Sequence, residues 1–217
     1  MSLSVSVVIP VYKRLEFIND ALASIYAQSR PINHVYVMAT EPQTHEAIKD
    51  YFPKDNLIYS LYIRDVYARK LNAAFEISPD DTIFVLNDDD MIASDFVEKC
   101  SDAMEKYNAD IVYTDMEMFG IEQRFVRALD WRKETFQVTT APFGTSLMKR
   151  AIGKQIKYQE NMAYLDWDFW WSAFEAGFTA YHLEEYLFLY RTHPEQWSRT
   201  CDTELETKKV KEHHGYT

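Results

Sequence analysis

The chain has 217 residues and a formal net charge of −11 at pH 7, with 47% hydrophobic and 26% charged residues. This composition is that of a soluble globular protein, and the length fits a single domain over residues 1–217. The acidic balance argues against a nucleic-acid partner, since binding phosphates requires a basic surface. The N-terminus lacks a basic segment that leads into an apolar signal region, and no window reaches about 18 apolar residues. We therefore expect a cytoplasmic protein without a transmembrane segment, with peripheral membrane contact left open.

Strands and helices alternate along the first half of the chain. Apolar runs predict buried strands at residues 5–9, 35–38, 57–63, 82–86 and 111–113. Apolar residues at helical spacing predict helices at residues 15–28, 46–51, 66–77 and 96–107. This order predicts an α/β protein with a Rossmann-like, mostly parallel sheet and helices on both faces. Ligands of such sheets bind where the strands end, so residues 10–14, 39–41 and 87–90 should share one rim.

The second half of the chain is less regular. Extended segments are predicted at residues 124–129, 145–148 and 179–190, and a very apolar helix at residues 166–176, ended by Gly177. Residues 203–214 are expected to form a terminal helix or a frayed tail. His213 and His214 lie in this lysine-rich tail, and we interpret them as part of a solvated terminus.

Three consecutive carboxylates follow the fourth predicted strand, in the run Asn87-Asp88-Asp89-Asp90. Adjacent carboxylates repel one another unless a positive charge lies among them. At the end of a sheet strand that charge is usually Mg²⁺ or Mn²⁺, which prefer oxygen ligands and often bind a phosphate as well. The run alone leaves the alternative of a solvated acidic turn open.

Three further segments carry candidate chemistry. Tyr12, with two cations after it, ends the first strand, where it is suited either to stacking on a base or to an ordinary turn. Asp166 begins the apolar helix, where backbone N–H groups would keep it ionised as a general base. It is equally an N-cap residue beside tryptophans of the core. His193 is a structural hydrogen bonder unless the fold brings it to the carboxylates.

Taken together and in this order, the motifs resemble the family 2 glycosyltransferases of the GT-A fold. The resemblance rests on residues 6–28, 70–74, 86–96, 165–177 and 190–193. It implies transfer of a sugar from a nucleotide-sugar donor to an acceptor hydroxyl, with inversion at the anomeric carbon. It also implies a nucleotide-sugar-binding half at residues 1–115, an acceptor-side half at residues 116–200 and a tail at residues 201–217.

The resemblance assigns roles to individual residues. It implies that Asp89 and His193 bind the Mn²⁺ or Mg²⁺ cofactor and that Asp166 is the catalytic base. The donor would be contacted by Pro10, Tyr12, Glu41, Arg69, Asn72, Asn87 and Asp88. The expected acceptor is a saccharide or a lipid-linked molecule, used in the synthesis of a surface polysaccharide or a glycolipid.

The chain departs from the family pattern at several positions. Asn87 replaces the first Asp of the metal motif, Leu165 replaces a Glu, and Leu71 replaces a frequent Arg. Glu41 stands where a pair of Asp residues usually reads the base. A UDP-sugar is the default donor, but dTDP and GDP sugars remain open. The alternative function is a non-catalytic domain that binds a nucleotide sugar or acts as a scaffold.

Overall fold

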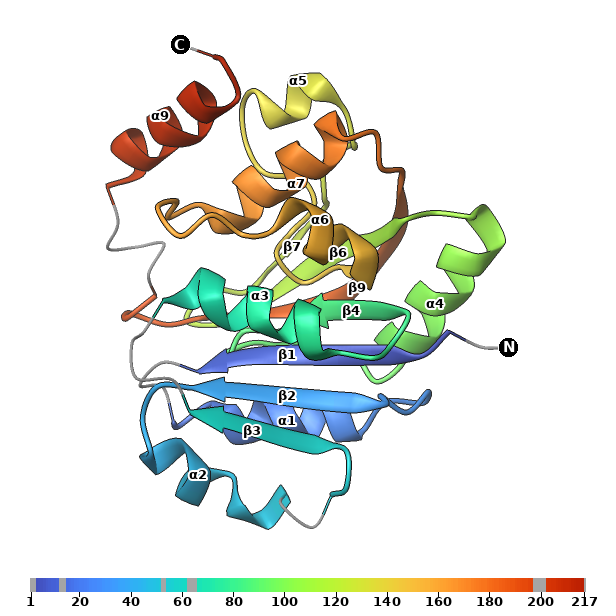
Figure 1. Ribbon diagram of the computed structural model, residues 1–217, viewed down its shortest axis with the longest axis vertical. Helices are drawn as coiled ribbons and strands as arrows, with labels where there is room; N and C mark the ends of the chain where they lie inside the picture. Colours follow the sequence, from blue (N-terminus) through green and yellow to red (C-terminus); the bar gives the residue numbers. More distant parts are fainter. Residues whose placement is uncertain (1–2, 12–14, 52–53, 62–65, 197–201, 217) are drawn as a thin grey trace.

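The computed structural model describes residues 3–11, 15–51, 54–61, 66–196 and 202–216. One mixed sheet has the strand order β3-β2-β1-β4-β8-β6-β9-β5, with β7 paired to β6 (Figure 1). The strands are β1 (Val5–Val11), β2 (His34–Ala39), β3 (Leu57–Leu61), β4 (Thr82–Val85), β5 (Met91–Ile92), β6 (Ile111–Gly120), β7 (Arg124–Val126), β8 (Leu147–Lys149) and β9 (Ala180–Thr192). The helices are α1 (Ile18–Tyr26), α2 (Gln43–Ala47), α3 (Tyr67–Ile77), α4 (Phe96–Tyr107), α5 (Lys133–Phe136), α6 (Arg150–Ile156), α7 (Leu165–Glu175) and α9 (Thr203–His213), with a short 3-10 helix at Lys49–Tyr51.

The first four predicted strands form a parallel block, as expected. β1 pairs with β2 and with β4, and β2 pairs with β3, all in parallel. Val11 lies opposite Ala39, and Val8 lies opposite Val85, so the carboxyl ends meet at one edge of the sheet. β1 does not stop at Pro10 but continues to Val11, since a proline near the end of a strand removes only one ladder hydrogen bond. This edge carries the acidic run.

The second half of the sheet mixes directions. β8 lies between β4 and β6 and is antiparallel to both, whereas β6 and β9 are parallel. β6 extends over ten residues, well beyond the three predicted for it. The short elements β5, α5 and α6 were not predicted, because segments of two to seven residues are too short to show a recognisable apolar period.

Helices cover both faces of the sheet, which confirms the predicted layers (Figure 1). Val7 packs in the cluster formed with α1 and α4, whereas the next residue, Val8, packs with α3, α6 and α7. Successive side chains of a strand point to opposite faces, so one buried strand contributes to both cores. The tryptophans of α7 are buried on this second face, as expected of core residues: Trp167, Trp170 and Trp171.

The tail is not the solvated terminus that we expected from the sequence. Val210 of α9 is fully buried, and the ring of His214 stacks on Trp171 of α7 at a centroid distance of 4.3 Å. The apolar surface of α7 is too large to be covered by the sheet alone, and α9 covers part of it (Figure 1). Across the described ranges, no helix has both the length and the apolar character required to cross a bilayer.

Candidate active site

The acidic run forms a buried turn between β4 and β5. Asp88, Asp89 and Asp90 are only 1%, 6% and 1% exposed, which rules out a solvated turn. The Arg191 backbone N–H donates to Asp90 Oδ1 at 2.9 Å, and the Asn87 amide donates to Asp90 Oδ2 at 3.3 Å. Burial and the neighbouring charge of Asp89 nonetheless raise the pKa of Asp90 well above its ordinary value. The environment of the turn therefore disfavours the ionised form of Asp90.

Helix α1 and the residues just after it hold the segment that follows the acidic turn. Ser24 Oγ accepts a hydrogen bond from the Ile92 N–H at 3.3 Å. The Gln28 amide donates to the Ala93 carbonyl at 2.7 Å and accepts from the Val97 N–H at 3.0 Å. Ser24 of α1 and Gln28, two residues past the end of that helix, thus hold the backbone that follows the acidic turn.

His193 reaches the acidic turn from the end of β9. Its Nε2 lies 3.1 Å from Asp89 Oδ2, although the two residues are 104 positions apart in the chain. The ring also contacts Phe17, at a centroid distance of 5.2 Å. Gln196 supports the segment, because its amide donates to the Arg191 carbonyl at 2.6 Å and accepts from the His193 N–H at 3.2 Å. The fold thus brings His193 to the carboxylates, which is the condition for treating it as a candidate metal ligand.

Asp166 lies in the first turn of α7. The N-cap residue is Tyr164, so the reading of Asp166 as an N-cap is wrong. Its Oδ1 accepts a hydrogen bond from the Trp167 N–H at 3.0 Å. Burial raises the pKa of Asp166 and outweighs the backbone N–H groups that lower it, so the expected ionising effect of the helix terminus is not the dominant one. A raised pKa suits a carboxylate that accepts a proton near neutral pH.

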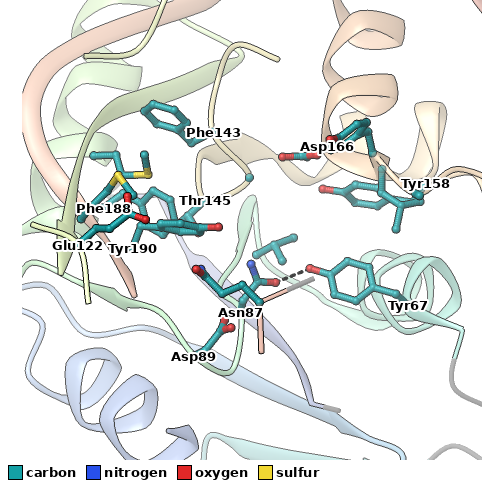
Figure 2. Close-up of a pocket in the computed structure, with 18 of the residues that line it drawn as sticks. Tyr67, Asn87, Asp89, Glu122, Phe143, Thr145, Tyr158, Asp166, Phe188 and Tyr190 are labelled. Carbon is teal, nitrogen blue, oxygen red and sulfur yellow. Dashed lines mark hydrogen bonds between the residues drawn. The ribbon is translucent and has the colours of Figure 1, made fainter. Parts of the chain in front are cut away.

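One cavity of about 740 Å³ joins these groups. Asn87 and Asp89 lie at its base, Asp166 and Tyr158 on one side, and Phe188 and Tyr190 on the other (Figure 2). The Tyr67 hydroxyl donates to Asn87 Oδ1 at 2.5 Å (Figure 2). The floor of the cavity therefore carries one amide and one carboxylate, its side wall a separate half-buried carboxylate, and the rest of its walls are largely aromatic.

Of the other predicted donor residues that the structure describes, none lines the cavity. Tyr12 falls outside the described residues. Pro10 is buried in β1, and Glu41 follows β2 at the same edge of the sheet. Arg69 pairs with Glu160 at 2.7 Å. Asn72 exchanges two hydrogen bonds of 2.9 Å with the Tyr158 backbone, which places Tyr158 against the cavity.

The sequence interpretation missed several residues of the cavity. Tyr67 stands one helical turn before the Lys70–Ala74 segment, so helical spacing was a usable signal. Met116 and Met118 on β6 face the cavity at alternate positions, a pattern that follows from the two-residue period of strands. Glu122 and Phe143 lie in loops, where no such period applies.

The donor atoms fit a divalent cation. A carboxylate oxygen of Asp89 and a ring nitrogen of His193 lie within hydrogen-bond distance of each other and are buried. Asp88 and Asp90 are buried beside them, but within the described residues this turn does not bring three ligand atoms together. Oxygen ligands suit Mg²⁺ and Mn²⁺, and an imidazole is compatible with the latter.

The profile of the family described as Glycosyl transferase family 2 matches residues 6–175, most of the chain. The chain belongs to this family. No curated protein sequence matches this chain. Family membership confirms the resemblance drawn from the motifs, and the solved structures below confirm the GT-A fold.

Solved structures of two other proteins share the fold of this family 2 member. S. aureus TarS 1-349 in complex with UDP-GlcNAc has a TM-score of 0.77 and 16% identity, covering 92% of this chain and 61% of TarS. The same protein in complex with UDP has a TM-score of 0.73 and 17% identity, and the match covers 99% of this chain and 73% of TarS 1-349. Mannosyltransferase PcManGT from Pyrobaculum calidifontis, in complex with GDP-Man and Mn²⁺, has a TM-score of 0.70 and 14% identity. The match covers 92% of this chain and 60% of PcManGT. The chain thus spans about three fifths of the TarS and PcManGT chains in their sugar-nucleotide complexes.

Proposed function

We propose that the protein is a metal-dependent inverting glycosyltransferase that uses a nucleoside-diphosphate sugar. The observation that carries this proposal is that one cavity contains both Asp89, in contact with His193, and the separate carboxylate of Asp166. Family membership supports it. Residues 1–115 would form the donor half and residues 116–200 the acceptor half.

The donor would lie with its diphosphate over the acidic turn. Asp89 and His193 would hold a Mn²⁺ or Mg²⁺ ion, which supplies charge to stabilise the leaving diphosphate. Asn87 and Asp88 would contact the ribose, with Pro10, Tyr12, Glu41, Arg69 and Asn72 around the nucleotide. The ligands of the similar structures, UDP-GlcNAc, UDP and GDP-Man, support this donor class. A UDP-sugar is our default.

Asp166 would act as the general base. In a single displacement, the acceptor oxygen bonds to the anomeric carbon while the bond from that carbon to the diphosphate breaks, which inverts the configuration. Asp166 takes the proton of the acceptor hydroxyl in this step. Its raised pKa and its place in the cavity wall support the role. The aromatic walls suit stacking on a saccharide or lipid-linked acceptor.

The proposal is tested by donor hydrolysis, which needs no knowledge of the acceptor. The protein is incubated with UDP, dTDP and GDP sugars, with Mn²⁺ or with chelator, and release of the nucleoside diphosphate is followed. We expect release from one donor class, only with the cation. Cation-dependent binding without release from any donor, even with added saccharide acceptors, would favour the non-catalytic alternative.

The pH dependence of turnover should report Asp166. The ionised carboxylate is the active form, so activity is lost as pH falls through the folded-state pKa, about tenfold per pH unit below it. Because burial raises the pKa of Asp166, this acid limb should lie above the range of an ordinary aspartate. The check is a pH–rate profile of wild type and Asp166→Asn. An unchanged acid limb in the residual activity of Asp166→Asn would assign the limb to another group.

His193→Ala should weaken binding of a nucleoside diphosphate with Mn²⁺ by about tenfold or more, because one ligand of the cation is lost. Binding of the free nucleoside, which has no diphosphate, should change much less. Calorimetric titration of UDP and of uridine distinguishes the two effects. Equal losses for both ligands would show that His193 only supports the structure.

A further inference from the structure

A second cluster of ligating side chains lies where α9 packs on α7, next to the candidate active site but outside its cavity lining. Asp168 of α7 is 1% exposed, and its Oδ1 contacts His213 Nδ1. The same oxygen lies 3.3 Å from His214 Nε2. One ligand atom from each residue lies within 4.8 Å of the other two. The docking of α9 therefore brings two imidazole nitrogens to one buried carboxylate oxygen.

The ring of His214 is held in a fixed orientation. It stacks on Trp171 with an interplanar angle of 1° and a centroid distance of 4.3 Å. Its Nδ1 lies 2.9 Å from Glu175 Oε2. The side chain is only 3% exposed. These contacts leave the Nε2 edge directed at Asp168 and away from solvent.

His214 Nε2 is buried and makes no hydrogen bond to any of the described residues, although Asp168 Oδ1 is close. If the Nδ1–H donates to Glu175, Nε2 carries a lone pair. In that neutral form the lone pair faces the lone pairs of a carboxylate oxygen, which is unfavourable. Burial lowers the pKa of His214, but Asp168 and Glu175 raise it by more, so either a proton on Nε2 or a metal cation relieves this repulsion. A cation between the two atoms would convert the repulsion into two favourable bonds.

We infer that a second metal site links α9 to α7 and binds Zn²⁺ or a similar ion. Its ligands are Asp168, His213 and His214. Imidazole ligands favour Zn²⁺ over Mg²⁺ and related oxygen-seeking ions. Ligands about 2.0–2.2 Å from a tetrahedral zinc lie about 3.4 Å apart, close to the 3.3 Å between His214 Nε2 and Asp168 Oδ1. His213 Nδ1 is in direct hydrogen-bond contact with the same oxygen, so its half-exposed ring would have to move away from Asp168 when the ion binds. Glu175 supplies the supporting carboxylate that typically orients a metal-bound histidine.

The site has an entry path and a structural consequence. The His213 side chain is 43% exposed, so the ion can reach the buried atoms from solvent. Asp168 follows Asp166 by two residues on the same helix, so an ion here would steady the helix that carries the proposed base. The inference does not depend on the glycosyltransferase proposal, since none of its ligands lines the cavity.

The test is equilibrium dialysis of the full chain against Zn²⁺ after treatment with chelator, with excess Mg²⁺ to compete for the acidic turn. We expect wild type and Asp89→Ala each to bind about one zinc ion at the tail. His213→Ala, which removes a half-exposed ring, should bind it at least tenfold more weakly. Glu175→Gln should weaken zinc binding by about 10–100-fold, as expected for loss of a supporting carboxylate. His34→Ala is the matched control, because it removes a partly exposed ring paired with Asp80 elsewhere and should bind zinc as wild type does.

Thermal unfolding gives a second readout. Zn²⁺ should raise the melting temperature of wild type and His34→Ala but not of His213→Ala, because an ion that binds only the folded state stabilises it. Circular dichroism confirms that each variant is folded. Equal zinc binding by wild type and His213→Ala would overturn the inference, and so would wild type that takes up no zinc. In the latter case the cluster is an ion-pair contact between the two helices.

Discussion

Asp166→Asn should lower turnover by about 10²–10⁴-fold, the usual contribution of general-base catalysis, and leave donor binding unchanged. The amide retains an oxygen that can accept the Trp167 N–H, but it cannot take up the acceptor proton. Because ionised Asp166 is disfavoured by burial, the variant should be at least as stable as wild type. The measurements are kcat for sugar transfer and the Kd of the nucleoside diphosphate with Mn²⁺.

The matched control for this substitution is Asp102→Asn on α4, a carboxylate that is 60% exposed and paired with Arg30. It removes one negative charge far from the cavity lining and should leave both constants as in wild type. Retained transfer by Asp166→Asn would remove this residue from the base role. A parallel loss of donor binding would instead indicate a damaged cavity.

Asp89→Ala should abolish cation-dependent nucleotide binding, the second large effect. A bound cation contributes several kcal/mol to the stabilisation of phosphate charge, so affinity with Mn²⁺ should fall by roughly 100-fold, to the value measured with chelator. Asp89 also raises the pKa of Asp90, and removing its charge relieves this repulsion. The variant should therefore stay folded despite losing the contact with His193. Calorimetric titration with and without Mn²⁺ measures the change, with Asp102→Ala as the control.

If Asp89→Ala bound the nucleotide with Mn²⁺ as tightly as wild type, the acidic turn would not be the cation site. A loss of binding that is equal with Mn²⁺ and with chelator would assign Asp89 to direct contact with the nucleotide. Only a selective loss of the cation-dependent part agrees with the proposed role.

The first half of the fold could be predicted because its signals are local. The strands β1, β2 and β4 are apolar runs, and α3 and α4 repeat their apolar residues at helical spacing. The later strands depend on partners far away in the chain. Asp115 is a polar residue in the middle of β6. Its carboxylate can be buried because it accepts a hydrogen bond from the Ala128 N–H and contacts His182. No local pattern indicates such compensation.

Among the predicted site residues, the structure brings Asn87, Asp89 and Asp166 to one cavity. It also brings His193 to Asp89, while the roles of these residues stay predictions. The acidic run is a local signal, and the resemblance supplied Asp166 and His193. The approach of His193 to Asp89 depends on the pairing of β9 with β5 and β6, which no window of sequence contains. The role of the tail was misread for the same reason, since His214 is buried against Trp171, 43 residues earlier in the chain.

The most direct test of the central proposal is a thermal-shift panel of UDP, dTDP, GDP, ADP and CMP, each with Mn²⁺ and with chelator. At a hundredfold excess over Kd, a ligand that binds only the folded state adds about 2.7 kcal/mol, or roughly 5–10 °C for a chain of this size. We predict a shift with one nucleoside diphosphate that requires Mn²⁺ and is absent in Asp89→Ala. No shift with any nucleotide, in protein that is folded and loaded with Mn²⁺, would contradict a nucleotide-sugar site at the acidic turn.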